Sequence, residues 1–186
     1  MKVNRNGQAE ILSKANLDDL FNVMPDRYRL LFGICYFTGC RIAEAIQLQR
    51  SDVGDRSITF RRQTTKTQKT RTVRINPQLA QIVAEAGLAE SGYLFPAKSG
   101  GQWTMTSGHL TTRAADLVLR KYCDYLGIKG VSTHSFRRTA LTHMSSAGVP
   151  LRHIQEISGH SSLASLQKYL EVSEQQKEEA IAVLGF

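Results

Sequence analysis

The feature that most restricts the fold of this chain is an apolar run near its beginning, at residues 30–37. A helix needs about 20 mostly apolar residues to cross a bilayer, so this run is far too short to do so. It is instead typical of a helix buried in a protein core. Asp26 is a candidate N-terminal cap for that helix, and Gly39 is expected to end it.

Helical patterns cover most of the remaining chain. Ser13 is expected to cap a short first helix, Pro77 to open a helix that continues to about residue 86, and Thr133 to cap a helix over residues 134–147. Further helices are expected at residues 41–48, 107–126, 151–158, 163–170 and 174–184, and the buried face of the first of these comprises Ile42, Ala45, Ile46 and Leu48.

Two short segments alternate between apolar and polar residues with the period of a strand. They are residues 57–60 and 72–75, and the stretch between them is rich in Thr, Lys and Gln. This pattern predicts an antiparallel hairpin. The expected fold class is therefore mainly α with a small antiparallel β-sheet (α+β). We expect a flexible N-terminal lead over residues 1–12, followed by one domain over residues 13–186.

Charge indicates the class of partner. The 186 residues include 24 Lys and Arg against 16 Asp and Glu, which gives a net charge of +8. A basic domain suits a polyanion such as double-stranded DNA, because counterion release drives such binding. The three cysteines follow no metal-binding spacing and are expected to be buried thiols of a reducing compartment. No secretory signal is visible, so a cytoplasmic, DNA-associated protein is expected, away from membranes.

Several short motifs carry residues suited to phosphodiester cleavage without a metal. They are Thr-Gly-Cys-Arg ending at Arg41, His-Ser-Phe-Arg from His134 to Arg137, Gly-His ending at His160, and Tyr169 nine positions later. Arginine binds phosphate oxygens through two parallel N–H groups and remains charged. A tyrosine can act as the nucleophile if a cationic neighbourhood activates its phenol.

The ordered set resembles the catalytic domain of the tyrosine recombinases (the phage integrase family) from about residue 10 to residue 175. The resemblance implies a mostly helical domain that cuts and rejoins DNA through a 3′-phosphotyrosine, with no cofactor and no metal. It implies that Tyr169 is the nucleophile, that Arg41, Arg137 and His160 bind the phosphate, and that His134 assists proton transfer at the tyrosine.

The family also carries a general-acid lysine in the turn between two strands. Counting back from the second predicted strand selects Lys66 over Lys69. Alternatively, the whole run 61–71 is a solvated basic hairpin that touches the DNA backbone. Both can hold, with Lys66 in the site and Lys69 or Arg71 on flanking phosphates. Glu44 matches an acidic position that orients its neighbours in the family, although a structural helix-face pair with Arg41 is the alternative.

The chain departs from the family pattern in two respects. Ser158 replaces the leucine that typically precedes Gly-His, which is expected to affect local packing more than chemistry. The catalytic pattern also begins too early to leave room for the family's N-terminal DNA-clamping domain. A catalytic domain alone should bind DNA weakly. The resemblance implies four protomers on two duplexes, although the protein can be a monomer in solution. The helix at 174–184 either docks on a neighbour or folds back on its own core.

Other functions explain less of the sequence. A type IB topoisomerase uses a similar set of residues, and a non-cutting DNA-binding remnant would retain the basic charge. A helix-turn-helix regulator over residues 150–169 leaves Arg41, Lys66 and Tyr169 unexplained. His143 and His153 have no acidic partners at ligand spacing, and a nucleotide-binding glycine loop is absent.

Overall fold

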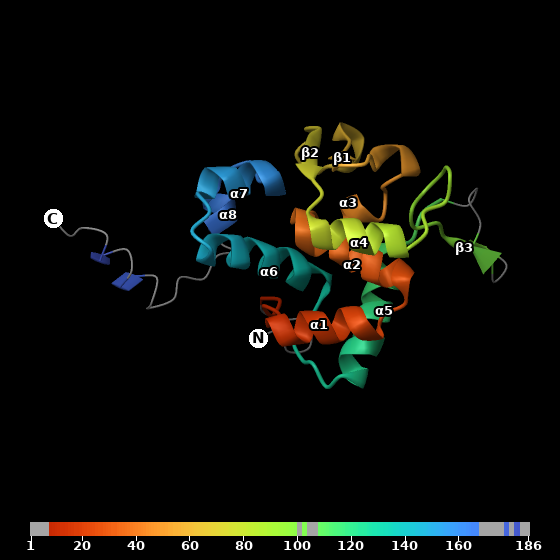
Figure 1. Cartoon of the computed structure of the whole chain (residues 1–186), viewed down its shortest axis with the longest axis horizontal. Helices are drawn as coiled ribbons and strands as arrows, with labels where there is room; N and C mark the ends of the chain where they lie inside the picture. Colours follow the sequence, from red (N-terminus) through yellow and green to blue (C-terminus); the bar gives the residue numbers. More distant parts are fainter. Residues whose placement is uncertain (1–7, 100–101, 104–107, 168–176, 179–180, 183–186) are drawn as a thin grey trace.

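The computed structural model describes residues 8–99, 102–103, 108–167, 177–178 and 181–182. It shows a mainly α-helical domain with short antiparallel strands (Figure 1), which confirms the expected fold class. Its labelled elements are α1 (Lys14–Val23), α2 (Asp26–Thr38), α3 (Ile42–Ala45), β1 (Ser57–Phe60), β2 (Arg71–Arg74), α4 (Pro77–Glu85), β3 (Lys98–Ser99), β4 (Gln102–Trp103), α5 (Thr112–Tyr125), α6 (Thr133–Ser146), α7 (Leu151–Ser158) and α8 (Leu163–Gln167). No helix in these ranges has the length and apolar character that a membrane crossing requires.

Helix α2 is the centre of the domain, and it contains the apolar run. It packs against α6, α4 and α3, and Leu31, Phe32 and Ile34 are fully buried. The predicted core helix is therefore confirmed. Asp26 is the first residue of the helix rather than its cap, because Pro25 occupies the cap position. Gly39 ends the helix in the left-handed conformation with φ of 60°, as expected of a C-terminal glycine.

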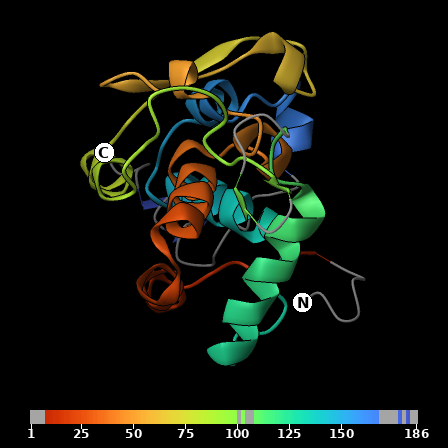
Figure 2. The ribbon, with the colours of Figure 1, turned by 90° about the vertical axis from the view of Figure 1, so that its right-hand side faces the viewer.

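The predicted hairpin is present. Strands β1 and β2 pair antiparallel, and Ile58 faces Val73 in the register. Both side chains are buried, so one face of the hairpin belongs to the core. Figure 2 shows the hairpin along one edge of the helical body. The second strand begins one residue earlier than predicted, at Arg71. A second pair of very short strands, β3 and β4, was not predicted.

The predicted helix at residues 107–126 begins later, at Thr112. The residues just before the helix form hydrogen bonds with an earlier segment instead: Leu110 N donates to Phe95 O at 2.7 Å. Thr111 caps the helix through its side chain. Helix α6 begins one residue earlier than predicted, so Ser132 is its cap and Thr133 its first residue.

The helix predicted at residues 41–48 is a single turn, α3. The four positions expected to be buried (Ile42, Ala45, Ile46 and Leu48) are nevertheless buried. Their burial confirms the predicted face, although regular helix ends at Ala45.

The last residues before α1 pack against the rest of the domain. Leu12, which the sequence placed in the N-terminal lead, is fully buried, and its N–H donates to Thr139 Oγ1 at 2.9 Å. Ser13 caps α1 as predicted. The three cysteines are unbridged and buried, also as predicted. Helix α8 is described to Gln167, and most of the predicted helix at 174–184 lies outside the described residues.

Candidate active site

Helices α6 and α7 bring Arg137 and His160 together. Arg137 is only 2% exposed although it is cationic. Its Nη1 donates to Gly39 O at 2.6 Å and to Ser158 O at 2.9 Å. Its Nη2 lies 2.9 Å from Nε2 of His160 and 3.2 Å from Nδ1. The guanidinium therefore connects the end of α2, the end of α7 and the histidine, although these segments are far apart in the sequence.

Arg41 follows Gly39 by two residues, in the short connection between α2 and α3. Arg41 stands just before α3, where its N–H donates to Glu44 Oε2 at 3.0 Å and its Nη1 donates to Oε1 at 3.1 Å. The predicted contact between Arg41 and Glu44 is therefore present. The carboxylate is 1% exposed, whereas the arginine side chain retains 24% exposure. Arg41 is thus partly open to solvent, while its carboxylate partner is fully enclosed.

Arg71, which the sequence analysis considered as a contact to a flanking phosphate, is held by several contacts within the protein. Its Nη2 forms an ion pair with Glu44 Oε2 at 2.7 Å, and its Nε donates to Ile157 O at 3.1 Å. Its guanidinium lies 4.4 Å from the centre of the Phe60 ring. The side chain is 10% exposed. Arg71 therefore joins the hairpin to α3 and α7 inside the protein.

These contacts shape the electrostatics of the cluster. Burial is the main cause that lowers the pKa of His160 to about 3, with the positive charges of Arg137, Arg41 and Arg71 adding to the effect. The imidazole is therefore neutral near pH 7. Burial also lowers the pKa of Arg137 to about 10, which leaves it charged at neutral pH.

Glu44 balances part of this positive charge. Burial works to raise the pKa of its carboxyl, but Arg71, the Arg41 N–H and Arg137 outweigh burial and hold that pKa below its usual value. The carboxylate is therefore ionised near neutral pH. Three arginines surround one carboxylate, so the cluster keeps a net positive charge that suits a phosphate.

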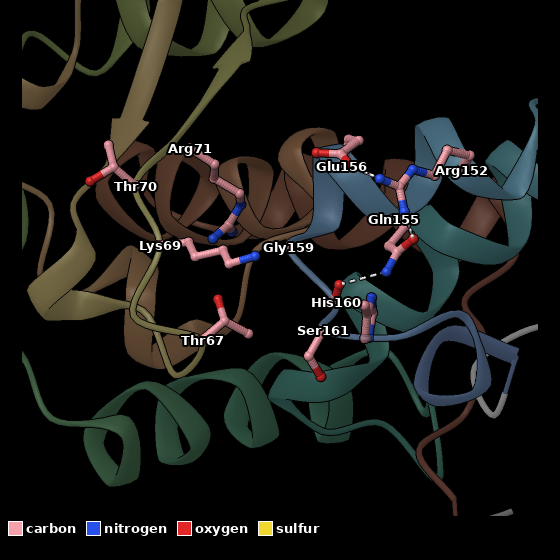
Figure 3. Close-up of a pocket in the computed structure, with 10 residues that line it drawn as sticks. All are labelled: Thr67, Lys69, Thr70, Arg71, Arg152, Gln155, Glu156, Gly159, His160 and Ser161. Carbon is pink, nitrogen blue, oxygen red and sulfur yellow. Dashed lines mark hydrogen bonds and ion pairs between the residues drawn. The ribbon is translucent and has the colours of Figure 1, made fainter.

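A cavity of about 290 Å³ lies between the hairpin and α7. Figure 3 shows Arg71 and Lys69 extending from one side toward Gly159, with His160 on the other side. Lys69 thus lines the cavity, whereas Lys66 does not. Lys66 lies on the turn that leads to Lys69 and is exposed.

That turn is closed by Thr65. Its hydroxyl donates to Lys69 O at 2.9 Å and accepts the Lys69 N–H at 3.2 Å. Gln68 takes a positive φ of 51° within the turn. Lys66 forms no hydrogen bond or ion pair with the residues that the structure describes. Lys69 is therefore the lysine that this structure places nearest the site, while Lys66 extends from an open turn.

His134 is exposed at the first turn of α6, so it does not share the burial of Arg137. Tyr169 lies outside the described residues, two positions beyond the last described residue of α8. The structure therefore unites Arg41, Glu44, Arg137 and His160, adds Arg71 to them, and leaves the placement of the predicted nucleophile open.

Two guanidinium groups of this cluster are among the buried arginines of the described residues that have an N–H donor without an acceptor. Within the described ranges, Nε of Arg137 and Nη1 of Arg71 have no hydrogen-bond acceptor. Buried polar groups are nearly always paired, and exceptions concentrate where a ligand completes the site. A phosphate is an acceptor of suitable charge for such donors.

The sequence analysis missed one residue of the cluster and misjudged another. Gln155 is buried on α7, and its Nε2 donates to His160 O at 3.1 Å. In the sequence Gln155 stands four residues after Leu151, so it shares a face of α7 with an apolar residue, and this position was a usable signal. Ser158 is fully buried, and its Oγ lies 2.7 Å from His160 Nδ1. It is thus bonded to the site and is more than a packing substitution.

Comparison with known proteins decides the family. The model of the phage integrase family matches residues 10–176. This chain belongs to the phage integrase family. The match covers nearly the whole chain, and it includes every motif from which the resemblance was inferred.

Individual relatives agree with this assignment. The tyrosine recombinase XerC of Myxococcus xanthus is 32% identical over 174 residues, which is 90% of this chain and 57% of that protein. The crystal structure of XerA recombinase superposes with a TM-score of 0.76 at 22% identity, covering 95% of this chain and 65% of that one. XerH recombinase in a post-cleavage complex with palindromic difH substrate gives a TM-score of 0.71 at 22% identity. The match covers 97% of this chain and 55% of that one. The chain thus spans little more than half the length of these proteins.

Proposed function

We propose that this chain is the catalytic domain of a site-specific DNA recombinase that cuts and rejoins double-stranded DNA. In this proposal Tyr169 attacks the scissile phosphate, forms a 3′-phosphotyrosine and releases a 5′-hydroxyl. One phosphodiester is exchanged for another, so the bond energy is retained and ATP is not required. A 5′-hydroxyl of a partner duplex then attacks the phosphotyrosine and completes strand exchange.

The observation that carries the proposal is the buried cationic cluster around Glu44. Arg137 is almost fully buried beside His160, and it has an N–H donor without an acceptor among the described residues. Such a fixed array stabilises the negative charge that develops on a phosphate in the transition state, because its dipoles need not reorganise. We assign this task to Arg41, Arg137 and His160, with Glu44 orienting Arg41 and Arg71.

Proton transfer is assigned to groups at the edge of the cluster. Lys66 is the proposed general acid for the departing 5′ oxygen, because it is exposed in the turn between β1 and β2, where the resemblance to the family implies such a lysine. Lys69 is assigned to the adjacent phosphate, since it lines the cavity. His134, exposed at the start of α6, is assigned to proton handling at Tyr169.

DNA as the partner agrees with the net charge of +8 and with the family. Four protomers on two paired duplexes are proposed for the active assembly, since two duplexes offer four strands to cut. The residues at 174–184 remain the proposed contact between neighbouring protomers.

A suicide substrate tests the proposal. A nick close to the cleavage position lets the cut fragment diffuse away, so the covalent protein–DNA adduct accumulates. The target sequence is found first by mapping covalent attachment to genomic fragments. We expect a denaturant-resistant adduct with the wild-type protein and none with Tyr169→Phe.

Two other results would give different conclusions. Binding to DNA without any adduct on any fragment would identify a non-cutting DNA-binding protein. Relaxation of a supercoiled plasmid that lacks recombination sites, without strand exchange, would identify a topoisomerase.

A further inference from the structure

Ser158 is an unusual residue for its environment. It ends α7, has no exposed surface, and stands where the resemblance to the recombinases implies a leucine. Gly39 and the side chain of Leu141 lie next to it, since a Cβ at Gly39 would meet both at 3.6–3.8 Å. A buried hydroxyl is unfavourable at such a position unless it is hydrogen-bonded. Its Oγ lies 2.7 Å from Nδ1 of His160, which supplies that bond.

The neighbouring donors restrict which nitrogen of His160 carries the hydrogen. A neutral imidazole has one donor and one acceptor nitrogen, and a guanidinium can only donate. Nη2 of Arg137 lies closer to Nε2, at 2.9 Å, than to Nδ1, at 3.2 Å. If Nε2 accepts from Arg137, then Nδ1 carries the hydrogen and donates it to Ser158 Oγ. The hydroxyl can then donate to Gln155 O, which lies 3.4 Å away.

We infer that Ser158 is a positioning residue that holds the His160 ring by its Nδ1 in either tautomer, so that Nε2 is the nitrogen presented to the scissile phosphate. This inference rests on the proposed function. In the DNA-free protein the hydroxyl accepts from Nδ1–H. When a phosphate takes the N–H of Arg137, the hydroxyl reverses and donates to Nδ1, and Nε2–H donates to a phosphate oxygen. His160 takes one proton from water at Nε2 and releases one from Nδ1 to water, so its charge is unchanged.

Only a residue that both donates and accepts can serve His160 in both states. A leucine would leave Nδ1 without this partner, and an alanine would also leave a small gap. One ring nitrogen can accept a hydrogen bond only if the ring is neutral; burial is the main reason that it is, and the neighbouring positive charges add to this effect. Arg137 on α6, Arg41 before α3 and Arg71 on β2 all disfavour the imidazolium, and Glu44 on α3 opposes them.

The first experiment compares Ser158→Ala and Ser158→Leu with Ser158→Thr, which keeps the hydroxyl. Ser146→Ala, on the exposed end of α6, is the matched control. At saturating suicide substrate we expect about 10-fold slower adduct formation with alanine and leucine, because one hydrogen bond to the ring is lost. Non-covalent DNA affinity should stay within about 2-fold, since phosphate charge dominates it. Threonine should restore most of the rate.

Wild-type cleavage rates in Ser158→Ala and Ser158→Leu would overturn the inference. A wild-type protein that forms no adduct would refute the proposed function instead. Thermal unfolding of each variant shows whether leucine, the larger side chain, is accommodated.

The second experiment needs no DNA and therefore stands apart from the proposed function. Nitrogen-15 spectra of the imidazole groups report which ring nitrogen is protonated, and His160→Gln identifies the signal among the five histidines. We expect a protonated, slowly exchanging Nδ1 in the wild type and in Ser158→Thr, and faster exchange at Nδ1 in Ser158→Ala, which lacks the hydroxyl that accepts its hydrogen. An unchanged exchange rate in Ser158→Ala would contradict the role of the hydroxyl.

Discussion

The two sides of the candidate active site are built in different ways. On one side Arg137 is enclosed and bonded to two carbonyl oxygens and to His160. On the other side Lys66 and Lys69 belong to an exposed turn closed mainly by the Thr65 hydroxyl. The side chains of the buried side are held in place by several hydrogen bonds, whereas the lysines of the other side are exposed. Charge stabilisation is thus assigned to the fixed side and proton delivery to the exposed side.

The largest effect is expected from the fixed side. Arg137→Lys keeps the charge but cannot bond Gly39 O, Ser158 O and His160 together. Single-turnover adduct formation should fall by about 1,000-fold, in the range for loss of a preorganised donor. Arg29→Lys is the control, because Arg29 pairs with Glu85 away from the cavity. If the two variants lost equal activity, the enclosed guanidinium would have no special role.

The turn can be examined by changing one lysine at a time. Lys66→Ala should slow adduct formation by about 100-fold, the usual contribution of a general acid. A substrate with sulfur in place of the departing 5′ oxygen should restore the rate, because a thiolate leaves without protonation. Lys69→Ala should slow adduct formation less than Lys66→Ala does, and the sulfur substrate should not restore its rate. Rescue of Lys69→Ala instead would assign the proton to Lys69.

Arg71 connects the hairpin to α3 and α7, so its loss should disturb the contacts on both sides of the site. Arg71→Gln removes the ion pair to Glu44 and the bond to Ile157 O, and we expect about 10-fold slower cleavage. The salt slope of DNA binding should also fall by about one unit, because Nη1 of Arg71 has no acceptor among the described residues and Arg71 lines the cavity, where a phosphate can accept from it. Arg74→Gln, exposed on the same strand, is the charge-matched control. An unchanged salt slope for Arg71→Gln would limit Arg71 to its contacts within the protein.

The smallest effect concerns stability rather than cleavage. The folded-state pKa of His160 lies far below its ordinary value of 6.5. The unfolded chain therefore binds more protons than the folded protein below about pH 6.5, and stability is lost as the pH falls from there toward about 3. Urea unfolding across this range should show a shallower decline for His160→Gln. Identical slopes for the two proteins would indicate that His160 is not held neutral by the fold.

The sequence predicted the parts of the molecule that depend on local pattern. Ser13 as a cap, the end of α2 at Gly39 and the bounds of α7 follow from neighbouring residues alone. The start of α5 was wrong because residues 108–110 pair with the segment around Phe95, a contact that no local pattern reveals. The same holds within the site for Arg71. Its carboxylate partner lies 27 residues earlier in the chain and its carbonyl partner 86 residues later.

The functional residues divide in the same way. Arg41, Arg137 and His160 were found because short motifs carry them. Ser158 was expected to affect packing more than chemistry, because its bond to His160 Nδ1 depends on how the chain turns after α7. The left-handed conformation of Gly159, with φ of 67°, makes that turn. The placement of Tyr169 against the cluster remains a prediction.

Peptide mapping of the covalent adduct tests the central claim most directly. After cleavage of a suicide substrate, the adduct is digested and the DNA-linked peptide is identified by mass spectrometry. The account predicts a single peptide that contains Tyr169, joined to a 3′-phosphate, with its yield abolished in Arg137→Lys. Attachment through another tyrosine, or an equal yield when Arg137 is replaced, would contradict the claim that the buried cluster and Tyr169 form one active site.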